Sequence, residues 1–179
     1  MDGLTEVGLG LNYDKLRIAR TSQQWIDAGA RLRDRIADEL TGLVADVQQI
    51  GSSSVLGLLA KPIVDLAAGL VAEQELAPVR TRLEHSGWIY RGDGGANGGH
   101  VFVLEARPWH RIAHLHIVDH DGEQWQEYLQ LRDLLRRSAD ARARYEAVKQ
   151  QLWLEVGDDR EAYTDGKSDI VRQLLHPDC

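Results

Sequence analysis

Cysteine is almost absent from this sequence, whose 179 residues include a single one at the last position, Cys179. One thiol forms neither a disulfide within the chain nor a cluster of thiolate metal ligands. Long apolar runs are also missing, since no segment approaches the roughly 18 residues that span a membrane. The N-terminus has no basic region of the kind that opens a signal peptide. These absences predict a cytoplasmic protein with no membrane partner.

A basic excess is missing as well. The chain carries 21 Lys and Arg residues against 28 Asp and Glu residues, which gives a formal net charge of -7. Proteins that bind the phosphate backbone of nucleic acids usually show an excess or a stripe of basic residues. We therefore expect that this chain has no nucleic-acid partner.

The length and the spacing of apolar residues predict one domain, residues 1–179. Helical spacing predicts helices over 22–40 and 73–85, further helices from 122 onward and a last one over 168–175. Runs rich in Val, Ile and aromatic residues predict strands over 44–50, 63–66, 88–91, 100–106 and 112–118, of which the last three form a largely antiparallel meander. The predicted fold class is α+β (mixed α/β), with a central mixed sheet flanked by helices and a helical C-terminal part.

Two glycine-rich segments are expected to be mobile. Met1 to Leu11 is a short lead-in to which the sequence gives no role. The loop from Gly92 to Gly99 is too long for a two-residue hairpin, and its composition predicts disorder, with a flap near a binding site as the alternative.

The segment IGSSSVLGLLAKPIVDL, residues 50–66, joins a Gly-Ser turn to an apolar strand that carries one acid, Asp65. Gly51 permits a tight turn, and Ser52 and Ser53 offer hydroxyl and backbone N–H groups, which suits an anionic ligand near the cation Lys61. A buried carboxylate needs a cation, a metal ion or several donors beside it. The alternative is an ordinary Ser-rich loop with Asp65 as a turn cap, because neither a Walker A loop nor a dinucleotide fingerprint is present.

A second cluster lies in the predicted strand over 112–118. His114 and His116 are two residues apart, so their imidazoles point to the same face of the strand. Such a pair can bind a divalent metal or place a proton donor beside a phosphate, and Arg111 just upstream is a candidate anion clamp. The alternative is that each His makes a core hydrogen bond. His110 and His120 are expected to be solvent-facing loop residues.

Four segments resemble motifs of the GrpB family, also called UPF0157, which is assigned to the nucleotidyltransferase superfamily. IGSSSVLGLLAKPIVDL resembles IGST-x-VPGL-x-AKPIIDI, and RIAHLHIVD resembles R-x-x-HLHVV. WQEYLQLRDLLR resembles W-x-x-x-L-x-FRDYLR, and YTDGKSDIVRQLL resembles Y-x-x-x-K-x-x-F-I. The motifs follow one another in the family's order and cover the chain from about Tyr13 to Leu175, so the resemblance implies a nucleotidyltransferase-like sheet.

The resemblance also implies site residues. The superfamily's phosphate-contacting Gly-Ser corresponds to Gly51 and Ser52, and its first metal-binding carboxylate corresponds to Asp65. Many members of that superfamily have Asp-x-Asp at this place, whereas here Leu66 and Ala67 follow, so the second carboxylate is missing. Because two-metal nucleotidyl transfer uses carboxylates to hold both ions, this departure puts the superfamily's chemistry in question.

The leading hypothesis is a nucleotidyltransferase-fold enzyme that binds ATP or another nucleoside triphosphate and transfers a nucleotidyl group to, or activates, a small molecule. Asp65 would ligate Mg or Mn with His114 and His116, and imidazole ligands would also suit Zn. Lys61 and Arg111 would neutralise charge, and Lys167 would close the site. The alternatives are ATP-dependent activation of a carboxylate, as in ligases, and a non-catalytic nucleotide or metabolite sensor. Neither the acceptor nor the oligomeric state follows from these motifs.

Overall fold

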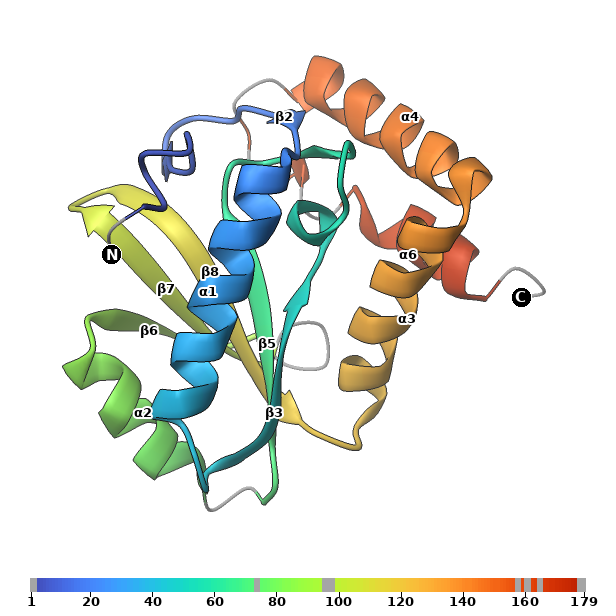
Figure 1. Cartoon of the computed structure of the whole chain (residues 1–179). Helices are drawn as coiled ribbons and strands as arrows, with labels where there is room; N and C mark the ends of the chain where they lie inside the picture. The colour runs from blue at the N-terminus through green and yellow to red at the C-terminus, as the bar shows by residue number, and fades with distance from the viewer. Residues whose placement is uncertain are drawn as a thin grey trace.

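The computed structural model describes residues 3–72, 75–94, 99–156, 159, 162–163 and 166–176. Its elements in chain order are β1 (Leu11–Asn12), β2 (Ala19–Arg20), α1 (Gln23–Glu39), β3 (Val44–Ile50), the 3-10 helix η1 (Ser52–Ser54), β4 (Leu59–Ala60), β5 (Val64–Leu70), α2 (Leu76–His85), β6 (Trp88–Asp93), β7 (His100–Arg107), β8 (His110–Asp119), α3 (Glu123–Arg137), α4 (Ala139–Val156) and α6 (Ser168–Leu175) (Figure 1).

The centre of the molecule is a mixed sheet with the strand order β3-β5-β8-β7-β6, and β1 pairs with the first residues of β8. Strand β5 runs antiparallel to β3 and parallel to β8, whereas β8, β7 and β6 form the expected antiparallel meander. The short strands β2 and β4 form a separate antiparallel pair that the sequence did not predict. The predicted α+β class with a central mixed sheet is confirmed.

One face of the sheet forms the main core with α1 and α2. Helix α1 begins where the Ser22 side chain accepts a hydrogen bond from the N–H of Trp25, as expected of a Ser N-cap. Its buried positions Leu32 and Ile36 pack against strand residues such as Leu66 and Leu115. Figure 1 shows α1 crossing the sheet and α2 beside β6. Because strand side chains alternate between faces, the residues between these core positions point to the opposite face.

The opposite face is covered by α3, on which α4 and α6 pack (Figure 1). Ala67 of β5 lies there with Trp125 of α3. A separate apolar cluster joins the chain after η1 to the three helices. Its buried members are Val55, Leu58, Leu135, Ala141, Tyr145, Ile170 and Leu174. The C-terminal helices therefore pack directly against the loop that carries the predicted phosphate site.

The segment before β1 differs from the expected mobile lead-in. Leu4 and Leu9 are 5% and 2% exposed and belong to the main core, and Leu11 pairs with β8 at Arg111. The N–H of Gly10 also donates to the carbonyl of Pro62. The glycines in this segment form turns between leucines that are anchored, so its composition was a poor guide to its packing.

Other predictions concern element boundaries. Strand β3 covers the predicted residues 44–50, and β5 starts at Val64 but continues through the small residues Ala67 to Gly69 as far as Leu70. His110 was expected in a loop, yet it lies in β8 and its ring nitrogen Nδ1 is 2.7 Å from Asn12 Oδ1, because β1 extends the sheet there. The loop over 92–99, for which disorder was predicted with a flap as the alternative, falls mainly on residues 95–98, which lie outside the described residues. No helix in the described part of the chain is both long and apolar enough to cross a membrane.

Candidate functional site

The loop after β3 has a backbone that requires glycine. Gly51 has φ +66° and ψ -170°, a conformation that L side chains rarely adopt. A Cβ atom on Gly51 would also lie 3.1 Å from Asp65 Oδ2. Ser54 closes the turn, because its hydroxyl donates to the Gly51 carbonyl at 2.7 Å. Ser53 is buried, and its hydroxyl accepts a hydrogen bond from the N–H of Asp65. The loop and the acidic strand are therefore held together directly.

Asp65 and His114 face each other across the parallel strands β5 and β8, where they are register partners. His114 Nδ1 lies 3.2 Å from Asp65 Oδ1. Burial by itself would raise the pKa of the Asp65 carboxyl. The hydrogen bond from His114, with the positive charges of His114, His116 and Lys167, outweighs burial and holds this pKa below its ordinary value. Asp65 is thus a stabilised carboxylate.

His116 lies on the same sheet face as His114, as predicted, but it has a different partner. Its Nδ1 atom is 3.3 Å from the hydroxyl oxygen of Tyr128, and the two rings are 5.5 Å apart. Tyr128 comes from α3, and burial together with the charge of Asp65 raises the pKa of its hydroxyl. The structure therefore contains two polar pairs, Asp65 with His114 and His116 with Tyr128. They lie side by side on one face of the sheet, because His114 and His116 are two residues apart in β8.

These side chains do not form a metal cluster. Among the described residues, no group of three or more His, Cys, Asp and Glu side chains could hold a metal ion. The position of the superfamily's second carboxylate is occupied by Ala67, which is fully buried against Trp125. A two-ion site therefore does not fit the part of the chain that the structure describes. Asp65 could hold a single Mg or Mn ion, since Mg often needs only one or two carboxylates plus phosphate oxygens.

Lysine side chains surround the loop. The Nζ atoms of Lys61 and Lys167 lie 4.6 Å and 5.2 Å from the centroid of the Tyr163 ring. Lys149 of α4 is 1% exposed, and its Nζ atom donates to Ser52 Oγ at 2.9 Å and to the carbonyl of Leu59. Lys61 and Lys167 lie near enough to act on the charge of Lys149, so the structure brings these lysines together with Ser52 and adds Lys149 and the ring of Tyr163.

Arg111 does not fit the predicted anion clamp. Its side chain is 1% exposed, and its guanidinium carbon lies 4.6 Å from the centroid of the Tyr13 ring. The Tyr13 hydroxyl donates to Glu105, and Arg91 in turn donates to that hydroxyl. A bidentate clamp needs a guanidinium that is open to its ligand, whereas Arg111 is covered by the ring of Tyr13, which follows β1.

Lys149 and Tyr128 are site residues that the sequence analysis missed. Lys149 follows Tyr145 by four residues and precedes Leu152 by three, so it stands on the apolar stripe of its helix. A cation at such a position needs a buried partner, so a lysine on an apolar stripe was the sequence signal that could have predicted a polar contact here. Tyr128 follows Trp125 by three residues, so helical spacing predicts its ring on the apolar face of α3 but says nothing of its hydroxyl.

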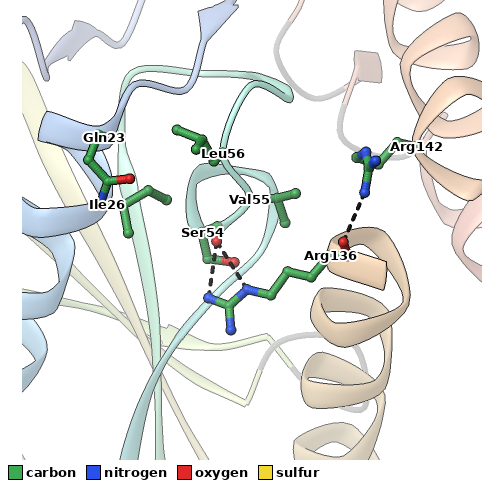
Figure 2. A pocket seen from close by; sticks show the side chains of 7 residues that line it. All are labelled: Gln23, Ile26, Ser54, Val55, Leu56, Arg136 and Arg142. Atoms are coloured by element: carbon green, nitrogen blue, oxygen red, sulfur yellow. Dashed lines mark hydrogen bonds between the residues drawn. The ribbon is translucent and has the colours of Figure 1, made fainter. Parts of the chain in front are cut away.

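A pocket of about 420 Å³ lies on the other side of the Ser loop, between α1 and the junction of α3 and α4 (Figure 2). Arg136 reaches across it and donates two hydrogen bonds to the carbonyl of Ser54. Arg142 donates to the carbonyl of Arg136. The pocket is lined by none of the predicted site residues, as far as the described part of the chain shows. The pocket therefore borders the Ser loop at Ser54, and Asp65 is not among its lining residues.

The family model described as GrpB protein matches residues 15–176. The chain belongs to the GrpB family. A UPF0157 protein of Streptomyces coelicolor is 37% identical over 93% of this chain and 81% of its own length. The crystal structure of GrpB from Enterococcus faecalis superposes with a TM-score of 0.76 at 24% identity, and the match covers 89% of this chain and 97% of that one.

The GrpB fold is also similar to that of nucleotidyltransferase polymerases. The Cid1 poly(U) polymerase, in its structure with magnesium and 3'-dATP bound, superposes with a TM-score of 0.52 at 13% identity. The match covers 76% of this GrpB chain but only 43% of Cid1. At this identity the similarity concerns the fold alone. The resemblance to the GrpB family and its nucleotidyltransferase-like sheet is confirmed.

Proposed function

We propose that this GrpB protein binds a nucleoside triphosphate at the loop Gly51–Ser54 and uses it to transfer a nucleotidyl group to, or to activate, a small molecule. The observation that carries the proposal is the pair of cations Lys61 and Lys167, which share the ring of Tyr163. Both act on the buried Lys149, which contacts Ser52, so their positive charge lies beside the loop and favours a polyanion.

The residues suggest a division of roles. Ser52 and the backbone of the loop would bind phosphate oxygens, and Lys61 and Lys167 would neutralise the charge that develops on the leaving phosphates. Asp65 would hold one Mg or Mn ion together with the phosphates, and that ion would supply further charge neutralisation. His114, which Asp65 orients through Nδ1, would accept the proton of the acceptor hydroxyl at its other ring nitrogen.

A second candidate is a nucleotide-binding module without catalysis. The buried Ala67 favours it, because an alanine stands where the superfamily has the second metal-binding carboxylate. The two candidates share the binding site and differ only in turnover.

Calorimetric titration with ATP, GTP, CTP and UTP, each with Mg and with Mn, tests the shared part. We expect at least one of them to bind, and Lys167→Met to weaken that binding by about tenfold, the scale of one charge-assisted hydrogen bond. Arg144→Met is the matched control, because it removes one positive charge from an exposed position of α4. Absence of binding for all four nucleotides would refute the proposal. Binding without release of pyrophosphate in the presence of candidate acceptors would select the non-catalytic module.

A further inference from the structure

Ser52 and Lys149 are joined by a contact that the phosphate-binding role does not require. We propose that they form a Ser–Lys dyad, in which Ser52 Oγ is a nucleophile and Lys149 Nζ is the base that takes its proton. Such dyads are a known variant of the Ser-His-Asp arrangement and are recognised by geometry, independently of the fold that carries them.

The geometry of the pair suits this role. Lys149 Nζ is 2.9 Å from Ser52 Oγ, although the residues are 97 positions apart in the sequence. The carbonyl of Leu59 also binds the amine and fixes its position. Lys149 is 1% exposed, whereas Ser52 is only partly buried. A substrate can therefore reach the hydroxyl while its base stays shielded from water.

The surroundings of Lys149 favour the neutral amine that a base needs. Burial lowers the pKa of Lys149 well below the ordinary lysine value of 10.5, and the positive charges of Lys167 and Lys61 lower it further. The carboxylates of Asp65 and Glu146 act in the opposite direction, and the Tyr145 ring lies 5.2 Å from Nζ. Glu146 is already engaged by Arg20 and by the N–H of Leu59.

The three serines of the loop are not equivalent. Ser53 accepts a hydrogen bond from the N–H of Asp65, and Ser54 donates to the carbonyl of Gly51. Both side chains are buried. Ser52, which follows the left-handed Gly51, is the serine whose hydroxyl contacts an amine in the described structure. The dyad is therefore specific to one position of the loop.

The lysines around the pair indicate phosphoanhydrides as the native substrate class, and this point alone rests on the proposed function. Ser52 Oγ would form a bond to phosphorus as the anhydride P–O bond breaks. The hydroxyl proton would pass to Lys149, and the leaving group would depart as pyrophosphate or a nucleotide. The acceptor oxygen would then bond to the phosphorus as the Ser52 O–P bond breaks, and its proton would pass to His114. Lys149 would return the first proton to the serine oxygen.

A small sulfonyl fluoride tests the nucleophile without any nucleotide. With methanesulfonyl fluoride, Ser52 Oγ forms a bond to sulfur, the S–F bond breaks, fluoride leaves and Lys149 takes the proton. We expect intact-mass and peptide analysis of the full chain to show one adduct, on Ser52. Ser52→Ala should remove the adduct, and Ser86→Ala, at an exposed serine after α2, should label as the parent does. The rate should rise with pH and level off well below pH 10.5, the ordinary lysine pKa.

The variant Lys149→Arg distinguishes a lysine that acts as a base from one that only makes a structural hydrogen bond to Ser52. Arginine keeps the positive charge and can still bind Ser52, but it does not deprotonate in proteins. The dyad predicts that Lys149→Arg labels roughly 100-fold more slowly, the scale of a lost general base. Equal labelling of Lys149→Arg and the parent would overturn the proposal, and so would a parent protein that is not labelled at Ser52.

If Lys149→Arg fails to fold by circular dichroism, the pH profile of the parent decides, because labelling that does not change with pH excludes Lys149 as the base.

Failure of the dyad and failure of the proposed function are distinguishable. A protein that binds a nucleotide by calorimetry but shows no sulfonylation retains the binding site and lacks the nucleophile. A protein that is sulfonylated at Ser52 but binds no nucleotide has the dyad and a different substrate class.

Discussion

His114 donates from Nδ1 to Asp65 Oδ1 at 3.2 Å, across two parallel strands that make these residues direct neighbours. The pKa of Asp65 is lowered in the folded state, so its ionisation stabilises the fold above the ordinary Asp pKa of 3.8. This contribution is lost as the pH falls through the lowered pKa.

We therefore expect Asp65→Asn to unfold at lower urea concentration than the parent at neutral pH, with the difference shrinking below about pH 4. Asp169→Asn, at an exposed ion pair, should show little difference at neutral pH.

The same Asp65→Asn variant should lose any nucleotide-dependent turnover, because the amide keeps the shape of the side chain but not the charge. Product analysis on the folded variant measures this. Turnover equal to that of the parent would remove Asp65 from the site.

Metal binding gives a separate prediction for Asp65 and the histidines. Asp65 alone is placed to hold an ion with the phosphates, so Mn affinity measured with saturating nucleotide should fall for Asp65→Asn and stay unchanged for His116→Ala, whose ring contacts Tyr128. His85→Ala, on the exposed face of α2, serves as the control. A lower affinity for His116→Ala than for His85→Ala would make His116 a ligand and contradict a site with Asp65 as its one protein ligand.

Gly51→Ala should destabilise the protein and weaken nucleotide binding. The backbone at Gly51 has a conformation that is essentially restricted to glycine, and the added Cβ would lie 3.1 Å from Asp65 Oδ2. We expect a loss of about 1–3 kcal/mol in the free energy of unfolding by urea titration. Gly57→Ala is the matched control, because Gly57 also has positive φ but has open space around it. An equal loss for both variants would show that contact with Asp65 adds nothing.

Ser52→Ala should weaken triphosphate binding by about 1 kcal/mol, the scale of one hydrogen bond, or about fivefold in Kd. Calorimetry measures this, with Ser54→Ala as the comparison. The effect should be larger if the bond is charge-assisted. An unchanged Kd would assign Ser52 to a structural role in the loop.

Leu9→Ala tests the anchored N-terminal segment. Leu9 is 2% exposed and belongs to the main core, so its truncation should lower the free energy of unfolding by about 2–5 kcal/mol. Leu154→Ala, at a leucine that is 79% exposed, should change it by less than about 0.5 kcal/mol. A segment that is truly mobile would make the two variants alike.

Much of the fold could be predicted from periodicity. Residues 44–50 alternate in burial along a strand, and Ser22 caps the helix that precedes it, so both elements were predicted almost to the residue. The short pair β2 and β4 has two residues in each strand, which is too few for any periodic pattern. The anchoring of Leu4 and Leu9 depends on tertiary contacts, which glycine-rich composition conceals.

The candidate site was predictable in part for a similar reason. Gly51, Ser52 and Asp65 are close in the sequence, and the two-residue spacing of His114 and His116 places both on one sheet face. Which partner each histidine finds depends on the strand register and on Tyr128 from α3, and neither follows from local sequence. The burial of Arg111 beneath Tyr13 and the contact of Lys149 with Ser52 join segments that are 98 and 97 residues apart.

The apolar cluster that joins Val55 and Leu58 to Tyr145 and Ile170 makes the loop and the C-terminal helices one thermodynamic unit. If the proposed nucleotide binds and orders the loop, the amides of α4 and α6 should exchange hydrogen more slowly in the bound protein. The coupling would also run from the helices to the loop. Ile170→Ala, which changes no residue of the proposed phosphate site, would lower the apparent affinity for the nucleotide by reducing the population of molecules whose loop is in its binding conformation. The sequence of these helices would then tune affinity without altering any residue that touches the ligand.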